Sequence, residues 1–398
     1  MTYLDFLRRH GAMASFGYSM ALMSSFGQTF FISLSGPDIR AAFGLGNAAF
    51  GSLYSAATLA SGVTMIWAGG VLDRVSVRVY ATAALAGLAT AALSLSLAGN
   101  IVMLGLSLFM LRVFGQGMLG HAAITSAARL PSGVRGRAVG LATLGFPTGE
   151  AILPGIALAV IASLGWTVAW KMAASVLALA LAAVLWLRPD GEAPASSPAG
   201  RAEPDATAPT RLSILRDRAF LAFLPSIVAP PAIMTGYLFY QRHLAETKGW
   251  PLELMAASLT GYALASVGCG VLMGFAVDRF GGLRMSRLHL AGLFASSLML
   301  AFVTGPFAAL AFFALTGATA GANNVVVPAV LAELYGTRHL GMVRALCLSV
   351  AVVASAATPI LFGFAIDAGV TVESIGIACA VYLAGASALN WLLPGLRR

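Results

Sequence analysis

Apolar stretches of helix length alternate with short polar segments along the whole chain. A transmembrane α-helix needs about 20 mostly apolar residues, and the stretches have this length, unlike the alternating strands of roughly ten residues that form barrels. Since the bilayer interior offers backbone groups no water, helices are the expected spanning elements. The predicted spans run over roughly 11–35, 46–69, 77–98, 101–127, 137–163, 166–187, 219–241, 252–276, 285–304, 306–333, 340–364 and 373–394.

One segment between the sixth and seventh spans lacks apolar periodicity. Residues 188–218 are rich in Pro, Ala, Ser and charged residues, a composition typical of flexible linkers. The chain is therefore predicted to contain a six-helix bundle over 1–187, a linker over 188–218 and a second six-helix bundle over 219–398.

A short charged motif occurs once in each predicted bundle. Residues 69–74 and 274–279 both have the spacing Gly-x-x-x-Asp-Arg, and the second copy stands 205 residues after the first. Pro154 and Pro359 repeat at the same offset. The predicted fold is therefore an all-α integral membrane protein with twelve transmembrane helices in two pseudo-symmetric bundles, an organisation found mainly in transporters.

The composition agrees with a membrane protein. Hydrophobic residues make up 59% of the chain, charged residues only 10%, and the mean hydropathy is +0.86, whereas soluble domains are about 25% charged. The net charge of +9 does not indicate a nucleic-acid partner, because the basic residues lie in short loops. Three cysteines far apart in apolar stretches predict no disulfide or metal site, and we expect no cofactor.

The distribution of Lys and Arg predicts the orientation. Nineteen of the 24 positive residues fall on the side of the termini and the linker, four on the other side, and Arg112 lies inside a span. Cytoplasmic loops carry the excess of positive charge. Both termini are therefore predicted to be cytoplasmic, and the short loops favour a bacterial inner membrane.

These features resemble the major facilitator superfamily. Its loop motif between helices two and three, and between eight and nine, is similar to both Gly-x-x-x-Asp-Arg copies, while residues 112–117 resemble its Arg-x-x-x-Gly-x-Gly motif. Residues 145–150 match the Gly-Pro-x-x-Gly-Gly motif of its drug antiporters only in part. The first helix and the loop pattern also resemble its bacterial monocarboxylate-transporter-like branch, although the eighth span lacks the charged residue often found there.

The resemblance implies that the loop motif is a conformational latch, with contacts made in one state of the transport cycle and broken in the other. An Asp beyond a helix end can bond the amides of a neighbouring helix and pair with Arg. The alternative is charge that only sets topology. The predicted latch residues are Gly69, Asp73, Arg74, Gly274, Asp278 and Arg279.

Two ionisable residues lie deep inside predicted spans. Arg112 and Glu150 differ in depth by about 3 Å at 1.5 Å per residue, so an ion pair is feasible. An unpaired charge at the bilayer centre costs about 2.5–3.5 kcal/mol on insertion scales. Neither residue is repeated in the second half. We hypothesise that Glu150 titrates with the coupling proton and that Arg112 sets its pKa. Protonation of Glu150 would release Arg112 to hold an anionic substrate group or to let the helices move; the alternative is a fixed structural pair.

Other polar residues in the spans are candidates for a central substrate cavity. A polar side chain in lipid is costly, so each should face protein or water, as a substrate contact or a packing hydrogen bond. These candidates are Gln28, Gln116, Tyr237, Tyr240, Gln241, Asn323 and Asn324.

The predicted function is secondary transport of a small organic solute, with proton coupling and an organic anion favoured by the buried Arg. The alternatives are proton-driven efflux of drug-like compounds and a non-transporting solute sensor. No nucleophile constellation or phosphate loop supports an enzyme. The expected partners are the substrate, protons and the lipid bilayer, and the two bundles around one cavity are expected to work as a monomer.

Overall fold

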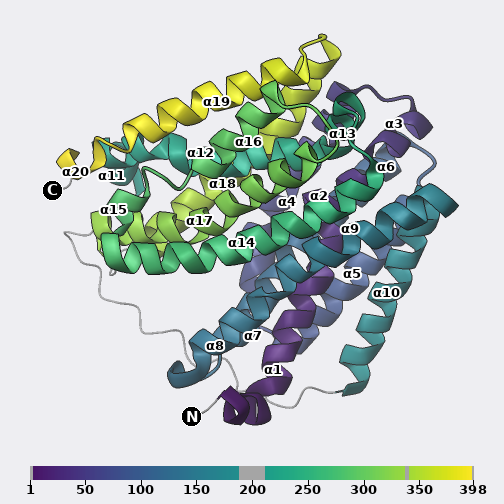
Figure 1. Cartoon of the computed structure of the whole chain (residues 1–398). Coiled ribbons are helices and arrows are strands. Elements are labelled where there is room, and N and C mark those ends of the chain that lie inside the picture. The colour runs from purple at the N-terminus through teal and green to yellow at the C-terminus, as the bar shows by residue number, and fades with distance from the viewer. Residues whose placement is uncertain (1–2, 188–210, 337–339, 397–398) are drawn as a thin grey trace. The chain divides into compact units, whose positions relative to one another are not determined.

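A computed structural model describes residues 3–187, 211–336 and 340–396 (Figure 1), and every regular element in these residues is helical. The chain divides into two compact units. Unit 1 comprises residues 1–45 and 53–201, and unit 2 comprises residues 46–52 and 202–398. Most of the predicted linker, residues 188–210, lies outside the described residues.

Unit 1 begins with one long helix, which is followed by several short helices and then by longer ones. Its elements are α1 (Tyr3–Ser24), η1 (Ser25–Gly27), α2 (Thr29–Ile32), η2 (Ser33–Ser35), α3 (Gly36–Phe43), α4 (Asn47–Val71), α5 (Val77–Ser96), α6 (Ile101–Leu111), the π-helix η3 (Arg112–Leu119), α7 (Gly120–Ala128), α8 (Ser132–Thr143), α9 (Gly145–Leu164) and α10 (Trp166–Leu187). The first residues of α4, up to Ser52, belong to unit 2.

Unit 2 contains the longest helices. Its elements are α11 (Arg211–Leu215), α12 (Arg218–Phe239), α13 (Gln241–Lys248), α14 (Leu252–Phe280), α15 (Gly282–Met285), α16 (Ala291–Phe302), α17 (Ala308–Tyr335), α18 (Leu340–Asp367), α19 (Val372–Leu389) and α20 (Leu393–Leu396).

Polar side chains fix where several helices begin. Asn100 accepts a hydrogen bond from the Met103 amide (2.9 Å) at the start of α6, and Ser76 does the same for Val79 (3.2 Å) at the start of α5. These caps satisfy amides that have no partner within the helix. The loop residues thus set the helix boundaries that hydropathy alone leaves uncertain.

Ten described helices are long and apolar enough to cross a bilayer. The two predicted spans that are not among them are interrupted. The first, predicted over 11–35, is cut at Ser24, and its helix α1 begins with several charged residues. The ninth, predicted over 285–304, contains turns up to Leu290, so that α16 has only 12 residues.

Each unit packs around its own core. In unit 1, α5 packs against α10, and α1 against α7, α8 and α9; in unit 2, α14 and α17 run side by side, as Figure 1 shows, and α12 packs against α18. Large apolar side chains remain on the surface, including Trp186 (83% exposed), Val102 (76%) and Phe275 (70%). Such surfaces are unfavourable in water and fit a lipid environment.

Candidate functional site

The first predicted span is broken in its middle. Helix α1 ends at Ser24, η1 follows, and Gln28 has an extended backbone (φ −85°, ψ 153°) before α2 begins at Thr29. The expectation of one continuous helix over 11–35 was therefore wrong, because α1 ends at Ser24 and the next α-helix begins only at Thr29. In membrane transporters, solute and ion sites form where spanning helices are interrupted. All residues from Ser24 to Thr29 except Phe26 are small or polar, and this is the sequence feature that marks the break.

The fourth span contacts this break through a π-helical segment. The segment η3 begins at Arg112, and such segments inside α-helices are frequent at functional sites. Within η3, Gly115 lies against the first span so closely that a Cβ atom there would be 2.6 Å from the Gly27 Cα. A Cβ on Gly27 would in turn be 3.0 Å from the Gln116 amide nitrogen. Two glycines thus bring the two backbones together.

Arg112 lies at this crossing and is only 3% exposed. Its Nη1 donates to the Gly27 carbonyl (3.2 Å) and to the Thr29 hydroxyl (3.4 Å). The guanidinium lies 5.4 Å from the centroid of the Tyr54 ring, and the Tyr54 hydroxyl donates to Thr29 (2.8 Å). The charge is therefore surrounded by a carbonyl, a hydroxyl and an aromatic face.

The expected partner of Arg112 is not in contact with it. In the part of the chain that the structure describes, no ion pair within 4.0 Å joins Arg112 to Glu150. The Arg112 Nε is buried and has no hydrogen-bond partner. A guanidinium carries five N–H donors, so this group retains capacity to bind an acceptor.

Glu150 lies on α9, which packs against the same broken span. The preceding residue, Gly149, is in such close contact with Ser25 that a Cβ atom would overlap the Ser25 hydroxyl. The Glu150 side chain is partly buried. Arg112 and Glu150 therefore lie on two different helices that both pack against η1, without forming a pair.

We call Gln28, Arg112, Gln116 and Glu150 the helix-break site, since each belongs to the break or to a segment packed against it. Gln28 is partly buried and Gln116 is exposed. The four side chains supply one cation, one carboxyl group and two amides. In general, guanidinium and amide groups bind carboxylates, and a carboxyl group exchanges protons.

The predicted tyrosines of unit 2 have structural contacts. Tyr237 is fully buried, and its hydroxyl shares a hydrogen bond with Ser297 (2.8 Å). Tyr240 donates to the carbonyls of Pro359 (2.7 Å) and Asn47 (3.1 Å). Gln241 is also fully buried, at the start of α13. All three lie in the core of unit 2.

Asn323 and Asn324 on α17 have different environments. Asn324 is exposed, whereas Asn323 is partly buried and its Oδ1 is buried without a hydrogen-bond partner. An unpaired buried acceptor costs about 1–3 kcal/mol. Asn323 is therefore one predicted cavity residue of unit 2 with an unsatisfied atom to offer a ligand or water.

An acidic cap at the start of α4 was not predicted. Asp367, at the end of α18, accepts hydrogen bonds at Oδ1 from the Asn47 amide (3.2 Å) and Asn47 Nδ2 (2.8 Å), and at Oδ2 from the Ala48 amide (2.7 Å). The Phe50 and Phe239 rings stack at 5.3 Å. Asp367 and Asn47 are 320 residues apart in sequence, so no local sequence pattern reveals the contact between them.

The charged residues of the two loop motifs are exposed. This applies to Asp73, Arg74, Asp278 and Arg279; among them, Arg279 lies over the Phe280 ring at 5.3 Å. Gly69 does not bring two helices together within unit 1, because a Cβ there would meet only Met65, at 3.9 Å. A Cβ on Gly274 would meet no atom within 4 Å.

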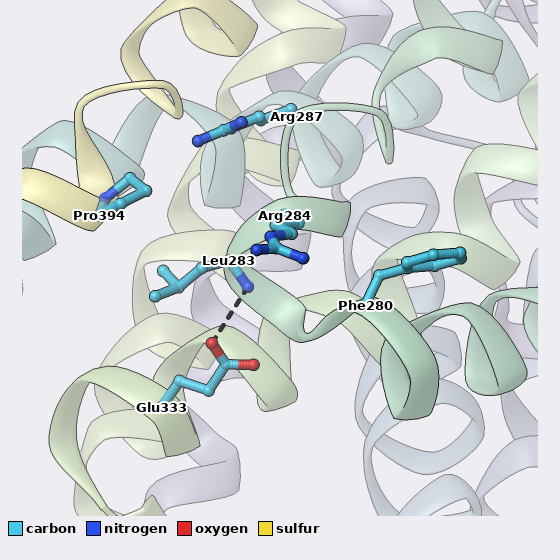
Figure 2. Close-up of a pocket in the computed structure, with 6 residues that line it drawn as sticks. All are labelled: Phe280, Leu283, Arg284, Arg287, Glu333 and Pro394. Carbon is cyan, nitrogen blue, oxygen red and sulfur yellow. Dashed lines mark hydrogen bonds between the residues drawn. The ribbon is translucent and has the colours of Figure 1, made fainter.

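Charged residues outside the motifs bind the loops instead. In unit 1, Arg129 Nη2 donates to the Leu72 carbonyl (2.8 Å). In unit 2, Glu333 on α17 accepts hydrogen bonds from the amides of Gly282 and Leu283, the latter at 3.3 Å (Figure 2). The related loops are therefore held by opposite charges.

The fold and the site together define a class. Long apolar helices, an interrupted span and a buried arginine in the membrane-spanning region are features of a multi-pass membrane transporter. A profile of the Major Facilitator Superfamily matches residues 17–257 and 233–398. The chain belongs to this family, whose members are secondary transporters of small solutes and not enzymes. Its twelve-helix architecture is thereby implied.

Solved structures share the fold at low sequence identity. The crystal structure of a bacterial homolog of the human lysosomal transporter Spinster, inward-facing and unoccupied, has a TM-score of 0.73 and 15% identity, covering 98% of this chain and 97% of that one. The crystal structure of a point mutant of the nucleoside transporter NupG has a TM-score of 0.74 and 11% identity, covering 97% and 100%. No curated protein matches. Nothing supports the resemblance to the monocarboxylate-transporter-like branch.

Proposed function

We propose that the protein transports a small organic anion and that Arg112 binds its anionic group. The observation that carries the proposal is a buried guanidinium with no carboxylate partner among the described residues and an unpaired Nε. Arg binds carboxylates through paired N–H donors, and a buried charge without a partner is costly. An anionic substrate at this position offsets that cost. Gln28 and Gln116 supply further hydrogen bonds.

We propose Glu150 as the proton-coupling group. It is a partly buried carboxyl on α9, in a helix that crosses the membrane. Because Glu150 is not paired with Arg112, Arg112 needs no prior release before it binds substrate. Protonation of Glu150 then neutralises a charge beside the broken span and allows the loaded protein to change conformation.

Proton movement in liposomes tests the coupling. Vesicles containing the purified protein and a pH dye are challenged with a panel of organic anions, cations and neutral solutes. We expect proton flux with one carboxylate class, and its loss in Glu150→Gln while substrate binding persists. The control Glu253→Gln removes an exposed carboxylate from the first turn of α14 and should leave the flux unchanged. Intact proton-driven transport in Glu150→Gln would overturn this role.

Substrate binding tests Arg112 separately. Arg112→Lys keeps the charge but loses the planar pair of donors, so we expect the KM for the anion to rise by about tenfold, and Arg112→Gln to lose binding. Arg344→Gln, at an exposed position on α18, is the control. Equal affinity for charged and neutral analogues in the unmodified protein would argue against an anionic substrate. Binding without flux would instead identify a solute sensor.

We further propose that the motif residues form a latch. We also propose that the protein lies in a bacterial inner membrane with both termini in the cytoplasm, and that it works as a monomer. The exposure of Asp73 and Asp278 supports contacts made in another state. Labelling of single cysteines in the loops, from each side of sealed vesicles, tests the orientation. Labelling of Asp73→Cys that changes with substrate would support the latch; labelling that does not change would contradict it.

A further inference from the structure

A basic pocket lies where the loop between α14 and α16 meets the end of the chain in unit 2. Its volume is about 480 Å³, and its lining residues come from α14, α15, the following turn, α17 and α20 (Figure 2). The residues that line it are Phe280, Leu283, Arg284, Arg287, Glu333 and Pro394. Volumes of roughly 300–1,000 Å³ are typical of small-molecule sites.

The pocket holds more positive than negative charge. Arg284 and Arg287 line the pocket together with a single carboxylate, Glu333, whose oxygens accept hydrogen bonds from the amides of Gly282 and Leu283. No ion pair within 4.0 Å joins these arginines to Glu333 in the described residues. The Arg287 Nε is buried and has no hydrogen-bond partner. Both guanidinium groups therefore retain donors for an anion.

The walls of the pocket are fixed by hydrogen bonds. Glu333 holds the start of α15, where Gly281 adopts φ +84°, a conformation that side chains other than glycine rarely take. Asn390 donates to the Ser286 carbonyl (2.7 Å), and Ser226 donates to Asn390 (3.0 Å). The turn that carries Arg287 is thus tied to two other helices.

The surroundings of the pocket match the interface between lipid headgroups and acyl chains. Arg287 lies over the Trp391 ring at 4.2 Å, and Trp391 is 63% exposed. Leu288, Leu392 and Phe280 are also exposed apolar side chains. Tryptophan is enriched at the headgroup level, and Arg clusters beside membrane helices attract anionic lipids.

The related loop of unit 1 uses its basic residue differently. Arg78 follows the first motif as Arg284 follows the second, but Arg78 donates to the Leu185 carbonyl (2.7 Å). Arg78 and Arg284 are 206 residues apart, and neither Ala81 nor Thr82, which stand 206 and 205 residues before Arg287, is basic. The pair of arginines is therefore a property of unit 2, and the repeat alone does not explain it.

We propose that this pocket binds the phosphate of an anionic phospholipid headgroup through Arg284 and Arg287. The exposed apolar side chains contact the acyl chains, which distinguishes a lipid from free phosphate. The proposal is independent of the transported substrate, because the pocket lies outside the helix-break site.

Lipid retention tests the proposal. Purified protein is titrated with phosphatidylglycerol or phosphatidylcholine, and bound lipid is counted by native mass spectrometry. We expect selective retention of phosphatidylglycerol and about tenfold weaker binding in the double variant Arg284→Gln/Arg287→Gln. Arg216→Gln, an exposed arginine of unit 2 outside the pocket, should behave as the unmodified protein. Equal retention in the double variant would overturn the proposal.

A second measurement does not depend on the folding of that variant. Phosphatidylglycerol with brominated acyl chains should quench tryptophan fluorescence more than its phosphatidylcholine counterpart, and the difference should disappear in Trp391→Phe. Millimolar inorganic phosphate should not reverse the quenching. Full displacement by inorganic phosphate would identify a phosphate-ion site instead, and equal quenching by both lipids would also refute the assignment.

Discussion

At the scale of single residues, the helix-break site depends on glycines as much as on charges. Arg112 reaches the Gly27 carbonyl because Gly27 and Gly115 allow two backbones to approach closely. A side chain at either position would separate the elements that carry Arg112 and Gln28. The chemistry of the site therefore rests on residues that have no functional group.

Gly115→Ala should destabilise the protein and weaken substrate binding. The added Cβ would lie 2.6 Å from the Gly27 Cα, where backbone atoms have no free space. Overpacking of this kind costs about 1–3 kcal/mol, so thermal unfolding should occur at a lower temperature. Gly140→Ala on α8 adds a methyl group with no atom within 4 Å and is the matched control. Equal unfolding temperatures for the two variants would show that the crossing is looser than described.

At the scale of elements, two acidic residues cap segments that are distant in sequence. Asp367 caps α4, and Glu333 caps α15. Negative charge at a helix N-terminus binds free amides and interacts favourably with the helix dipole. These contacts fix where α4 and α15 begin, although neither acid belongs to the repeated motif.

Asp367→Asn should loosen the start of α4. The amide keeps one acceptor oxygen but loses the charge and one of the two oxygens that bind Asn47 and Ala48. The loss should be about 0.5–2 kcal/mol, seen as faster amide hydrogen exchange over the first turn of α4. Thr371→Ala, which removes the cap of α19, should change exchange only at α19. Unchanged exchange at Ala48 in Asp367→Asn would contradict the capping role.

Glu333→Ala should release the loop that contains α15. The amides of Gly282 and Leu283 would lose their acceptor, at a cost of about 1–3 kcal/mol. Limited proteolysis should then cut near residues 281–285. Asp278→Ala removes a nearby exposed carboxylate with no hydrogen bond among the described contacts and should leave the loop protected. If the loop resists proteolysis equally in both variants, packing alone stabilises it and the hydrogen bonds of Glu333 do not.

At the scale of the whole molecule, α4 passes from unit 2 into unit 1 between Ser52 and Leu53. Transporters of this family consist of two helical bundles, and alternating access moves one against the other. Within unit 2, the start of α4 is held by Asp367, Tyr240 and the stacked Phe50 and Phe239 rings. We expect this contact of the start of α4 with Asp367 and Tyr240 to break in another state of the transport cycle.

Cross-linking should therefore stop the transport cycle reversibly. The double variant Asn47→Cys/Asp367→Cys is made in a background where the three native cysteines are replaced by serine. It is treated with a short thiol-specific cross-linker that contains a disulfide. Solute flux should be lost after this treatment and should return after reduction. Each single variant given the same treatment should keep its flux. Transport that continues after complete cross-linking would show that α4 and α18 stay together throughout the cycle.

The sequence alone determined the class of protein. Apolar runs of helix length, the repeated Gly-x-x-x-Asp-Arg motif and the buried Arg112 are local or periodic features, and they predicted an all-helical transporter. The two ends of α10 (Trp166–Leu187) also agree with the predicted span over 166–187, because hydropathy changes sharply at both ends.

Only the tertiary structure decided which polar groups meet. The break at Gln28, the π-helix at Arg112 and the separation of Arg112 from Glu150 depend on close backbone contact between helices far apart in sequence. The burial of Tyr237 and the cap of Asp367 depend on partners 60 and 320 residues away. Hydropathy indicates the free-energy cost of a polar residue in lipid, but tertiary packing determines which partner group offsets this cost.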